Sequence, residues 1–345
     1  MLVLSLFVYF YNFIMSLFVK RFDFSAIFFF YSPYFLLLIF FGWVNLQELS
    51  KDYYLYYAWF NYIKNSQVNF LSDKDPLFQY LSIFLMNVFN SIEYVFLFFI
   101  SLSVLLKFFI GIKFFERQII WLYFILVFCR FYILHDLTQI RASLAISLCM
   151  IGYYFFINKK KKYIFLFILA FLFHKSTLVF ILSLLVFKFL NIYKSKLFNL
   201  VVLSFSPLLY FLSSKFSTLF FGSFNDDRLS VYSDGNYSQN SEISIFSFYV
   251  LLKFFILIIN YYFWSKMSDY EKKFNFFVAL GLLFQMLFSS NGVLGWRFSE
   301  IFAYFDIFCL IMVLKFLKPN DRFLYFIFCI LLSILMLYAT SFSKA

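Results

Sequence analysis

The sequence predicts an all-α fold, a polytopic transmembrane helical bundle of about 11–12 spans. The chain of 345 residues is 64% hydrophobic and only 13% charged, whereas a soluble domain carries about 25% charged residues. Its apolar residues also form runs of about 20, the length that crosses a bilayer. A soluble fold of this size could not hide so much apolar surface from water, so lipid must cover much of it.

The apolar runs divide the chain into spans within a predicted single integral membrane domain, 1–345. The run 76–90 is short and fits a half-span or an interfacial helix. His174, Lys175 and Ser176 interrupt another run, which indicates two short helices joined at the outer surface or, alternatively, a re-entrant pair. The predicted spans are 1–18, 24–43, 92–111, 118–134, 138–157, 163–173 with 176–190, 198–213, 245–264, 274–290, 299–317 and 323–340.

The loops predict an orientation. Basic residues such as Lys113, Arg117 and the run 159–162 fall on one side, which the positive-inside rule assigns to the cytoplasm. The two long polar stretches, about 44–75 and 214–244, fall on the other side and are predicted periplasmic loops. We therefore expect a multi-pass protein of a bacterial inner membrane.

Several classes of function are disfavoured. The net charge of +12 is spread over short loops and forms no long basic face, so no nucleic-acid partner is expected. The four Cys lie far apart inside apolar runs without metal-ligand spacing. Walker, HExxH, GxSxG and CxxC motifs are absent. We expect no cofactor and no metal site.

Arginines mark the first candidate site. The string LHDLTQIRASLA places Asp136, Gln139 and Arg141 at the start of a span, and Arg130 lies just upstream. Two guanidiniums at one bilayer level would suit a diphosphate, because Arg presents a planar fork of donors to phosphate oxygens. The alternative is an arginine that snorkels to the membrane interface.

A second candidate lies in GWRFSEIFAYFDIF. Arg297, Glu300 and Tyr304 are spaced i, i+3 and i+7, which would form one polar stripe on an apolar helix. The stripe fits a second anion clamp with a positioned carboxylate. It also fits an Arg–Glu pair that only neutralises itself.

Two further strings complete the set. His174 in FHKSTL is one of two His and could act as a general base or be structural. In KDYYLYYAWF, Asp52, Tyr56 and Phe60 recur every four residues. That spacing fits a sugar-binding wall whose carboxylate accepts a proton, or an interfacial helix of the aromatic belt.

In this order, the motifs resemble the oligosaccharide repeat-unit polymerases of bacterial surface polysaccharides, the EpsG-like branch of the Wzy class. The similarity covers about residues 40–310. Ser50 stands where a Gly often precedes the Asp, and Asp75 replaces a frequent Glu. The matching pieces are Asp52-x3-Tyr56-x3-Phe60, Asp75-Pro76, Gln139-Ile140-Arg141-x2-Leu144-Ala145, His174-Lys175-Ser176-x-Leu178 and Arg297-x6-Tyr304-Phe305.

The resemblance implies a glycosyltransferase-C-like fold and metal-independent, inverting transfer between polyprenyl-diphosphate-linked oligosaccharides, which serve as donor and acceptor. A chain-length regulator and a flippase are candidate partners. The stretch 214–244 could cover the sugar as a lid. In this scheme Arg130, Arg141 and Arg297 bind the diphosphate, His174 or, second, Asp52 is the base, and Asp136, Gln139, Tyr56, Glu300 and Tyr304 position the substrate.

Two other functions stay open. A flippase or transporter for lipid-linked oligosaccharides could use the same basic residues, although transporters favour midplane sites and internal repeats. A membrane acyltransferase could use His174 or His135 on a surface glycan.

Overall fold

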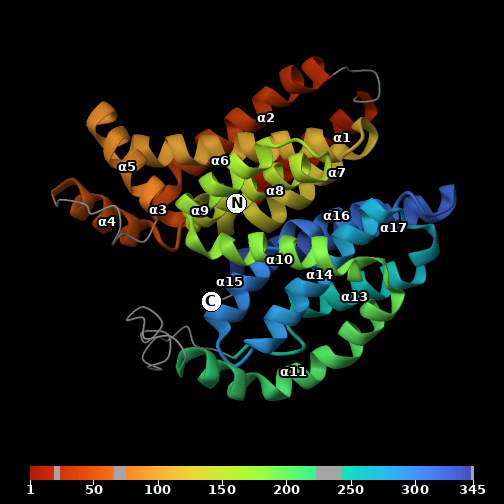
Figure 1. The fold of residues 1–345 in the computed structure, drawn as a ribbon. Helices are drawn as coiled ribbons and strands as arrows, with labels where there is room; N and C mark the ends of the chain where they lie inside the picture. The colour runs from red at the N-terminus through yellow and green to blue at the C-terminus, as the bar shows by residue number, and fades with distance from the viewer. Residues whose placement is uncertain (19–23, 66–74, 223–241, 343–345) are drawn as a thin grey trace. The chain divides into compact units, whose positions relative to one another are not determined.

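The computed structural model describes residues 1–18, 24–65, 75–222 and 242–342, and these ranges contain helices and short connections but no β-strand (Figure 1). The all-α prediction is confirmed. Most of the predicted loop 214–244, and residues 66–74 of the loop 44–75, lie outside the described residues.

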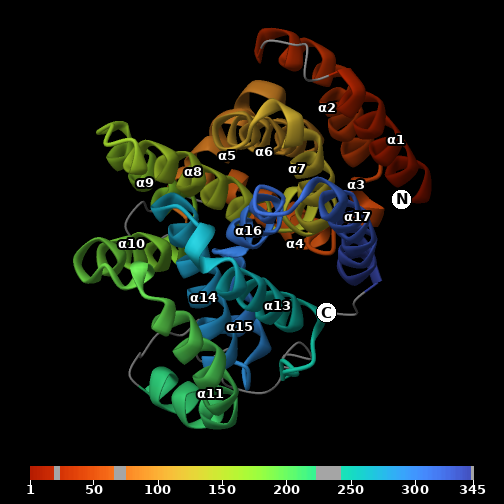
Figure 2. The ribbon, with the colours of Figure 1, turned by 90° about the vertical axis from the view of Figure 1, so that its right-hand side faces the viewer.

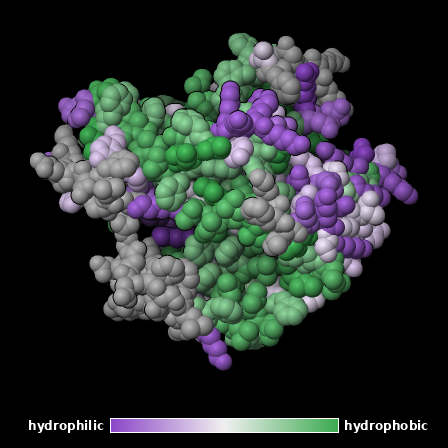
Figure 3. Space-filling view, viewed as in Figure 1, coloured by the Kyte–Doolittle hydropathy of each residue, from purple (hydrophilic) through white to green (hydrophobic). Residues whose placement is uncertain are grey.

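Six helices in these ranges are long and apolar enough to cross a membrane: Ser25–Val44, Ile92–Phe114, Arg117–Thr138, Ile140–Ile157, Lys196–Phe216 and Pro319–Thr340. Six shorter apolar helices of 10–17 residues accompany them. The protein is thus a multi-pass membrane protein, while the figure of about 11–12 spans stays a prediction. Large apolar side chains also lie on its surface, and the face in Figure 3 is mostly hydrophobic.

The described residues pack as two compact units: unit 1 comprises those of 1–178 with 331–342, and unit 2 comprises those of 179–330. The prediction of one integral membrane domain is not tested by this division. Unit 1 contains α1 (Leu2–Phe18), α2 (Phe24–Val44), α3 (Leu46–Leu49), α4 (Tyr53–Asn65), α5 (Pro76–Phe89), α6 (Ile92–Phe114), η2 (Arg117–Ile119), α7 (Ile120–Val127), η3 (Phe128–Thr138), α8 (Ile140–Ile157), α9 (Lys162–Phe173) and η4 (Lys175–Thr177).

Helix α6 lies at the centre of unit 1, where it packs against α2, α5, α7 and α8, and α8 packs along α9 (Figures 1 and 2). Gly152 permits the close approach of α8 and α9, because a Cβ there would come within 2.6 Å of the Phe167 ring. Small residues are common at such transmembrane interfaces, where they let backbones approach.

The span that begins with α7 changes to a π-helix, η3, for its last 11 residues. The backbone N–H of Gln139 donates to the backbone carbonyl of Leu134, five residues earlier, at 2.9 Å. The sequence predicted a regular helix over 118–134, so the π-helix and its extension to Thr138 were missed. π-helical segments are rare and are frequent at functional sites.

Unit 2 contains most of α10 (Leu178–Leu190), η5 (Ile192–Lys194), α11 (Lys196–Gly222), α13 (Phe248–Tyr262), η6 (Trp264–Lys266), α14 (Asp269–Leu287), α15 (Gly292–Glu300), α16 (Ala303–Val313) and the first half of α17 (Pro319–Phe342). Phe277 stacks on Phe305 with ring centroids 4.5 Å apart. A polar layer crosses this core, since Asn275 donates to Asn199 and accepts from Asn260, both at 2.9 Å.

The sequence predicted an interrupted helix at His174 and a continuous helix over 299–317, and only the first prediction is confirmed. The interruption at His174 is confirmed, because α9 ends at Phe173 and α10 begins at Leu178. The predicted span 299–317 is not one helix: α15 ends at Glu300 and α16 begins at Ala303. The stripe of Arg297, Glu300 and Tyr304 is therefore broken, and this part of the interpretation is wrong.

Candidate active site around Asp75

Three motifs that lie far apart in the sequence meet at the Asp75 carboxylate in unit 1. Arg141 Nη1 lies 2.6 Å from Asp75 Oδ2, and His174 Nδ1 lies 3.4 Å from Asp75 Oδ1. The Lys175 backbone N–H donates to the same Oδ1 at 3.3 Å. We call Asp75, Arg141 and His174, with the Lys175 amide, the Asp75 cluster.

Each member of the cluster is placed by a helix end. Asp75 is the N-cap of α5, with Pro76 at its first position, but its side chain makes no capping hydrogen bond. Its oxygens face Arg141, in the first turn of α8, and His174, where α9 stops in an extended conformation (φ −160°, ψ 111°). An Asp at the N-cap usually accepts a hydrogen bond from the first turn of its helix. Because the Asp75 carboxylate instead contacts Arg141 and His174, we infer that these contacts are more favourable than the capping hydrogen bond.

Aromatic rings surround the Arg141 guanidinium. Its Cζ lies 5.6 Å from the Tyr56 ring centroid, 5.5 Å from that of Trp59 and 5.9 Å from that of Phe78. These are cation–π distances. Tyr56 and Phe60 are both buried on one face of α4, as the four-residue spacing predicted. The rings fix the plane of the guanidinium fork.

The cluster is buried on its acidic side and open on its basic side. The Asp75 side chain is 5% exposed, whereas Arg141 and His174 are 28% and 24% exposed. Burial would raise the pKa of the Asp75 carboxyl, but the contact and charge of His174, the charge of Arg141 and the Lys175 amide together hold that pKa below its usual value. The carboxylate therefore stays ionised and the two basic side chains reach the surroundings.

The arrangement offers two chemical functions. The Arg141 side chain is 28% exposed and pairs with Asp75 through Nη1, and a guanidinium has five N–H donors, so donors remain for an anion. The Asp75 carboxylate lies beside one nitrogen of His174 and can orient the imidazole, which is the arrangement of a general base and the carboxylate that orients it. An anion site and a base thus share one carboxylate.

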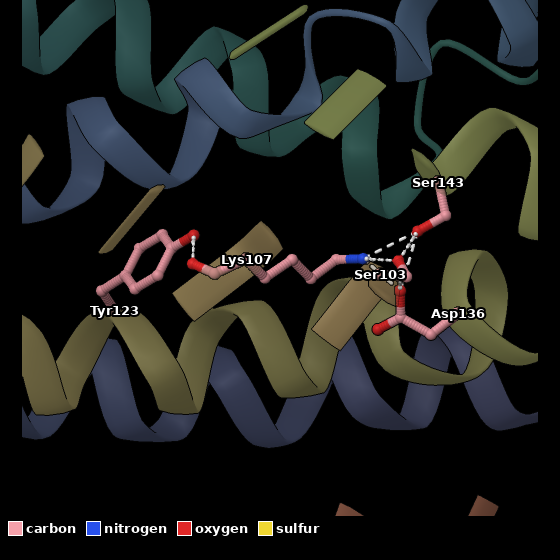
Figure 4. A network of polar contacts seen from close by, with 5 residues as sticks. All are labelled: Ser103, Lys107, Tyr123, Asp136 and Ser143. Atoms are coloured by element: carbon pink, nitrogen blue, oxygen red, sulfur yellow. Dashed lines mark hydrogen bonds and ion pairs between the residues drawn. The ribbon is translucent and has the colours of Figure 1, made fainter. Parts of the chain in front are cut away.

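Asp136, predicted to position substrate, lies elsewhere. Its carboxylate forms an ion pair with Lys107 and accepts from the hydroxyls of Ser103 at 2.5 Å and Ser143 at 2.7 Å (Figure 4). Lys107 also donates to both hydroxyls, and both charged side chains are at most 5% exposed. We call these four residues the Asp136 cluster. Its closure argues against contact between Asp136 and a substrate.

Lys107 was not identified from the sequence. A charge inside the apolar run 92–111 is a signal, because ionisable groups inside spans are costly and need a partner. The Tyr123 hydroxyl also donates to the Lys107 carbonyl at 3.0 Å (Figure 4). Asp75 was quoted as part of a motif without a role, although an Asp directly before the helix-starting Pro76 was visible in the sequence.

Other predicted site residues of unit 1 have different surroundings. Arg130 is 3% exposed inside η3, with its Cζ 5.8 Å from the Phe131 ring, rather than at the helix end with Arg141. Gln139 is half-buried between η3 and α8. Asp52 is half-buried just before α4, and its carbonyl accepts from the Tyr56 amide at 3.0 Å. Their predicted roles stay predictions.

The third group of predicted residues lies in unit 2. Arg297 is exposed on α15, Glu300 is 5% exposed at the end of that helix, and Tyr304 is fully buried after the break. Gly295 lets α15 pack tightly, because a Cβ there would come within 3.0 Å of the Phe288 carbonyl. A role of Arg297 and Glu300 with the diphosphate stays a prediction.

Among the residues that the structure describes, no group of three or more His, Cys, Asp or Glu side chains could hold a metal ion. The four Cys are buried as free thiols.

Comparison with known proteins identifies the family of this chain. The model of the EpsG family matches residues 27–345, which includes every motif quoted above. No curated protein and no solved structure matches the chain, so the glycosyltransferase-C-like part of the fold prediction stays a prediction. The EpsG family consists of membrane proteins of polysaccharide biosynthesis. With its multi-pass helical fold and a match over nearly its whole length, the chain belongs to the EpsG family.

Proposed function

We propose that this protein polymerises polyprenyl-diphosphate-linked oligosaccharide repeat units into a surface polysaccharide at the periplasmic face of a bacterial inner membrane. The growing chain on its lipid diphosphate is the donor, and a single lipid-linked repeat unit is the acceptor. The Asp75 cluster is the observation that carries this proposal, because it joins a partly exposed arginine and a histidine to one carboxylate.

The leaving group needs charge stabilisation. As the bond from the anomeric carbon to the diphosphate oxygen breaks, negative charge grows on the diphosphate. The Arg141 guanidinium supplies donors to that charge, and its fixed plane requires no reorganisation during the reaction. Lys175, whose side chain is exposed beside the cluster, adds a further positive charge.

The attacking sugar hydroxyl must lose a proton. In this mechanism His174 accepts it while the hydroxyl oxygen forms the new glycosidic bond, and the polyprenyl diphosphate departs. Asp75 keeps the imidazole oriented and stabilises the imidazolium that forms. Attack opposite to the leaving group inverts the anomeric centre. Asp52 remains the second candidate for the base, and Arg130 and Arg297 remain candidates for further diphosphate contacts.

Replacing Arg141 with Ala tests the proposal. We expect cells to carry surface lipid with a single repeat unit instead of a ladder, because loss of one charge-stabilising donor costs about 10²–10³ in rate. Arg117→Ala, on η2 at the other end of α6, is the matched control and should keep the ladder. Both proteins must be present at wild-type level. Long chains in the Arg141→Ala strain would reject the assignment.

A flippase is the second candidate, because ion pairs lie buried inside apolar helices. Lys107 pairs with Asp136, and Lys253 lies 2.9 Å from Asp306 with both side chains at most 3% exposed. Such groups often mark a transport path. Purified protein in detergent separates the two functions, since a polymerase elongates lipid-linked units without a second compartment and a flippase cannot.

A further inference from the structure

A cavity of about 240 Å³ lies beside the first turn of α4 in unit 1. It is formed where α2 ends, α3 and α4 begin and α6 starts, so one end of four helices contributes to it. Its lining combines two aromatic rings, an amide and a carboxylate with apolar side chains: Trp43, Val44, Leu46, Gln47, Tyr53 and Glu93.

The aromatic members are held in place by other rings. Trp43 stacks with Tyr94, with centroids 6.1 Å apart and planes at 21°. Tyr53 stacks on Phe96 at 5.4 Å and 24°. Because these contacts fix the ring planes before any ligand arrives, binding against them costs little ordering of side chains.

The polar members are also oriented. Gln47 Nε2 donates to the Tyr53 hydroxyl at 3.3 Å. Glu93 Oε2 accepts from the Ser91 hydroxyl at 2.5 Å. Gln47 and Glu93 are exposed to the surroundings, so an amide and a carboxylate face whatever occupies the cavity.

We infer that this cavity binds one neutral pyranose ring of an oligosaccharide. A pyranose has an apolar C–H face that matches an aromatic plane and hydroxyls at its rim that match an amide and a carboxylate. The volume is below the about 300–1,000 Å³ of sites for drug-sized ligands, which suits a single ring. The Glu93 charge disfavours an acidic sugar. That the ring belongs to a lipid-linked repeat unit rests on the proposed function.

Contacts on α4 connect the cavity with the Asp75 cluster. Tyr53 lines the cavity, and Tyr56, three residues later on the same side of the helix, lies against Arg141. Both rings contact Phe96, at 5.4 and 6.0 Å. Tyr53 and Tyr56 are offset by only about 4.5 Å along the helix axis. A sugar in the cavity would be a near neighbour of the unit held at Arg141, which would let the enzyme select its own repeat unit.

Direct binding tests the inference. The probe is a set of lipid-free fragments of one or two repeat units, made by partial hydrolysis of the cell's own surface polysaccharide, and titrated calorimetrically into the full-length protein in detergent. We expect Trp43→Ala to weaken binding at least about tenfold, because truncating an aromatic anchor removes about 1.4 kcal/mol or more. Trp43→Phe should retain most of the affinity. Trp121→Ala, a Trp on α7 whose Nε1 donates to the Gln118 carbonyl, is the matched control and should bind as wild type does.

Glu93→Gln keeps the shape of an exposed side chain and so tests the cavity even if Trp43→Ala fails to fold. We expect weaker binding of the fragments and, in elongation assays, a raised KM with an unchanged kcat. The inference is rejected if the fragments do not bind the wild-type protein, or if they bind Trp43→Ala or Glu93→Gln as tightly. Trp43 and Tyr94 would then be an aromatic belt at the membrane interface. If the wild-type protein binds the fragments but elongates no lipid-linked units, the proposed polymerase function is rejected and the inference that the cavity binds a sugar stands.

Discussion

Two acidic clusters of unit 1 use the same kind of residues in opposite ways. In each, an Asp forms an ion pair with a Lys or Arg side chain from another helix: Asp75 with Arg141, and Asp136 with Lys107. The Asp136 cluster is closed, since its basic partner is 5% exposed, and two hydroxyls satisfy the remaining hydrogen bonds. The Asp75 cluster leaves its basic partner Arg141 28% exposed. Exposure of the cation, and not the presence of an ion pair, separates a cluster that can bind an anion from one that holds helices together.

The largest expected effect concerns the closed cluster. Lys107→Met leaves the Asp136 carboxylate buried without its cation, which should lower the free energy of unfolding by about 3–5 kcal/mol. Thermal unfolding in detergent measures this. Lys107→Met combined with Asp136→Asn should recover much of the loss, because no buried charge remains. If the single variant is as stable as the wild type, the Asp136 cluster is not a structural element and the comparison fails.

The next effect concerns the open cluster. Asp75→Asn keeps the shape of the side chain but removes the charge that orients Arg141 and His174, so we expect elongation to fall about 10²–10³-fold. The free energy of unfolding should change by no more than about 1 kcal/mol, because Arg141 is partly solvated. Asp75→Glu should retain more activity than Asp75→Asn.

Asp269→Asn is the control for a generic loss of an acidic partner, since Asp269 pairs with Lys194 at 3.6 Å while 59% exposed. It should elongate normally. Stability lost together with activity in Asp75→Asn would show that both clusters are structural.

The smallest effect is on the pH dependence of stability. The pKa of the Asp75 carboxyl is held below its usual 3.8 by His174, Arg141 and the Lys175 amide. A lowered pKa in the folded state adds stability that is complete above pH 3.8 and is lost as the pH falls through the folded value. The unfolding temperature of the wild type should therefore fall more steeply on acidification below pH 3.8 than that of Asp75→Asn. Equal slopes for the two proteins would show that the Asp75 ion pair does not contribute to the pH dependence of stability.

Much of the site could be predicted from the sequence, because the motifs are short and each sits at a helix end. Arg141, His174 and Tyr56 were named from spacing and order, and the structure brings them together around Asp75. The partner itself was missed: Asp75 lies 66 residues from Arg141 and 100 from Lys175. Periodicity describes one helix at a time and contains no information on which helix faces another.

The same limit explains the errors. Asp136 was assigned to the arginine motif because it is close to Arg141 in the sequence. Its actual partner, Lys107, lies 29 residues upstream, and a local sequence pattern cannot identify such a partner. The i, i+3, i+7 rule assumes a continuous helix, so the break between Glu300 and Ala303 could not be foreseen from spacing alone. The π-helix was missed for a related reason, since its hydrogen bonds leave no distinct period in an apolar run.

The sequence by itself determined that the chain is helical and crosses a membrane several times, because apolar length and composition dictate where a segment is stable. It also determined which polar residues interrupt the apolar runs. Only the tertiary structure decided what those residues do, because the surroundings of a charge depend on contacts between distant helices. Those contacts leave Arg141 half-buried among Tyr56, Trp59 and Phe78, whereas Lys107 is buried and only 5% exposed.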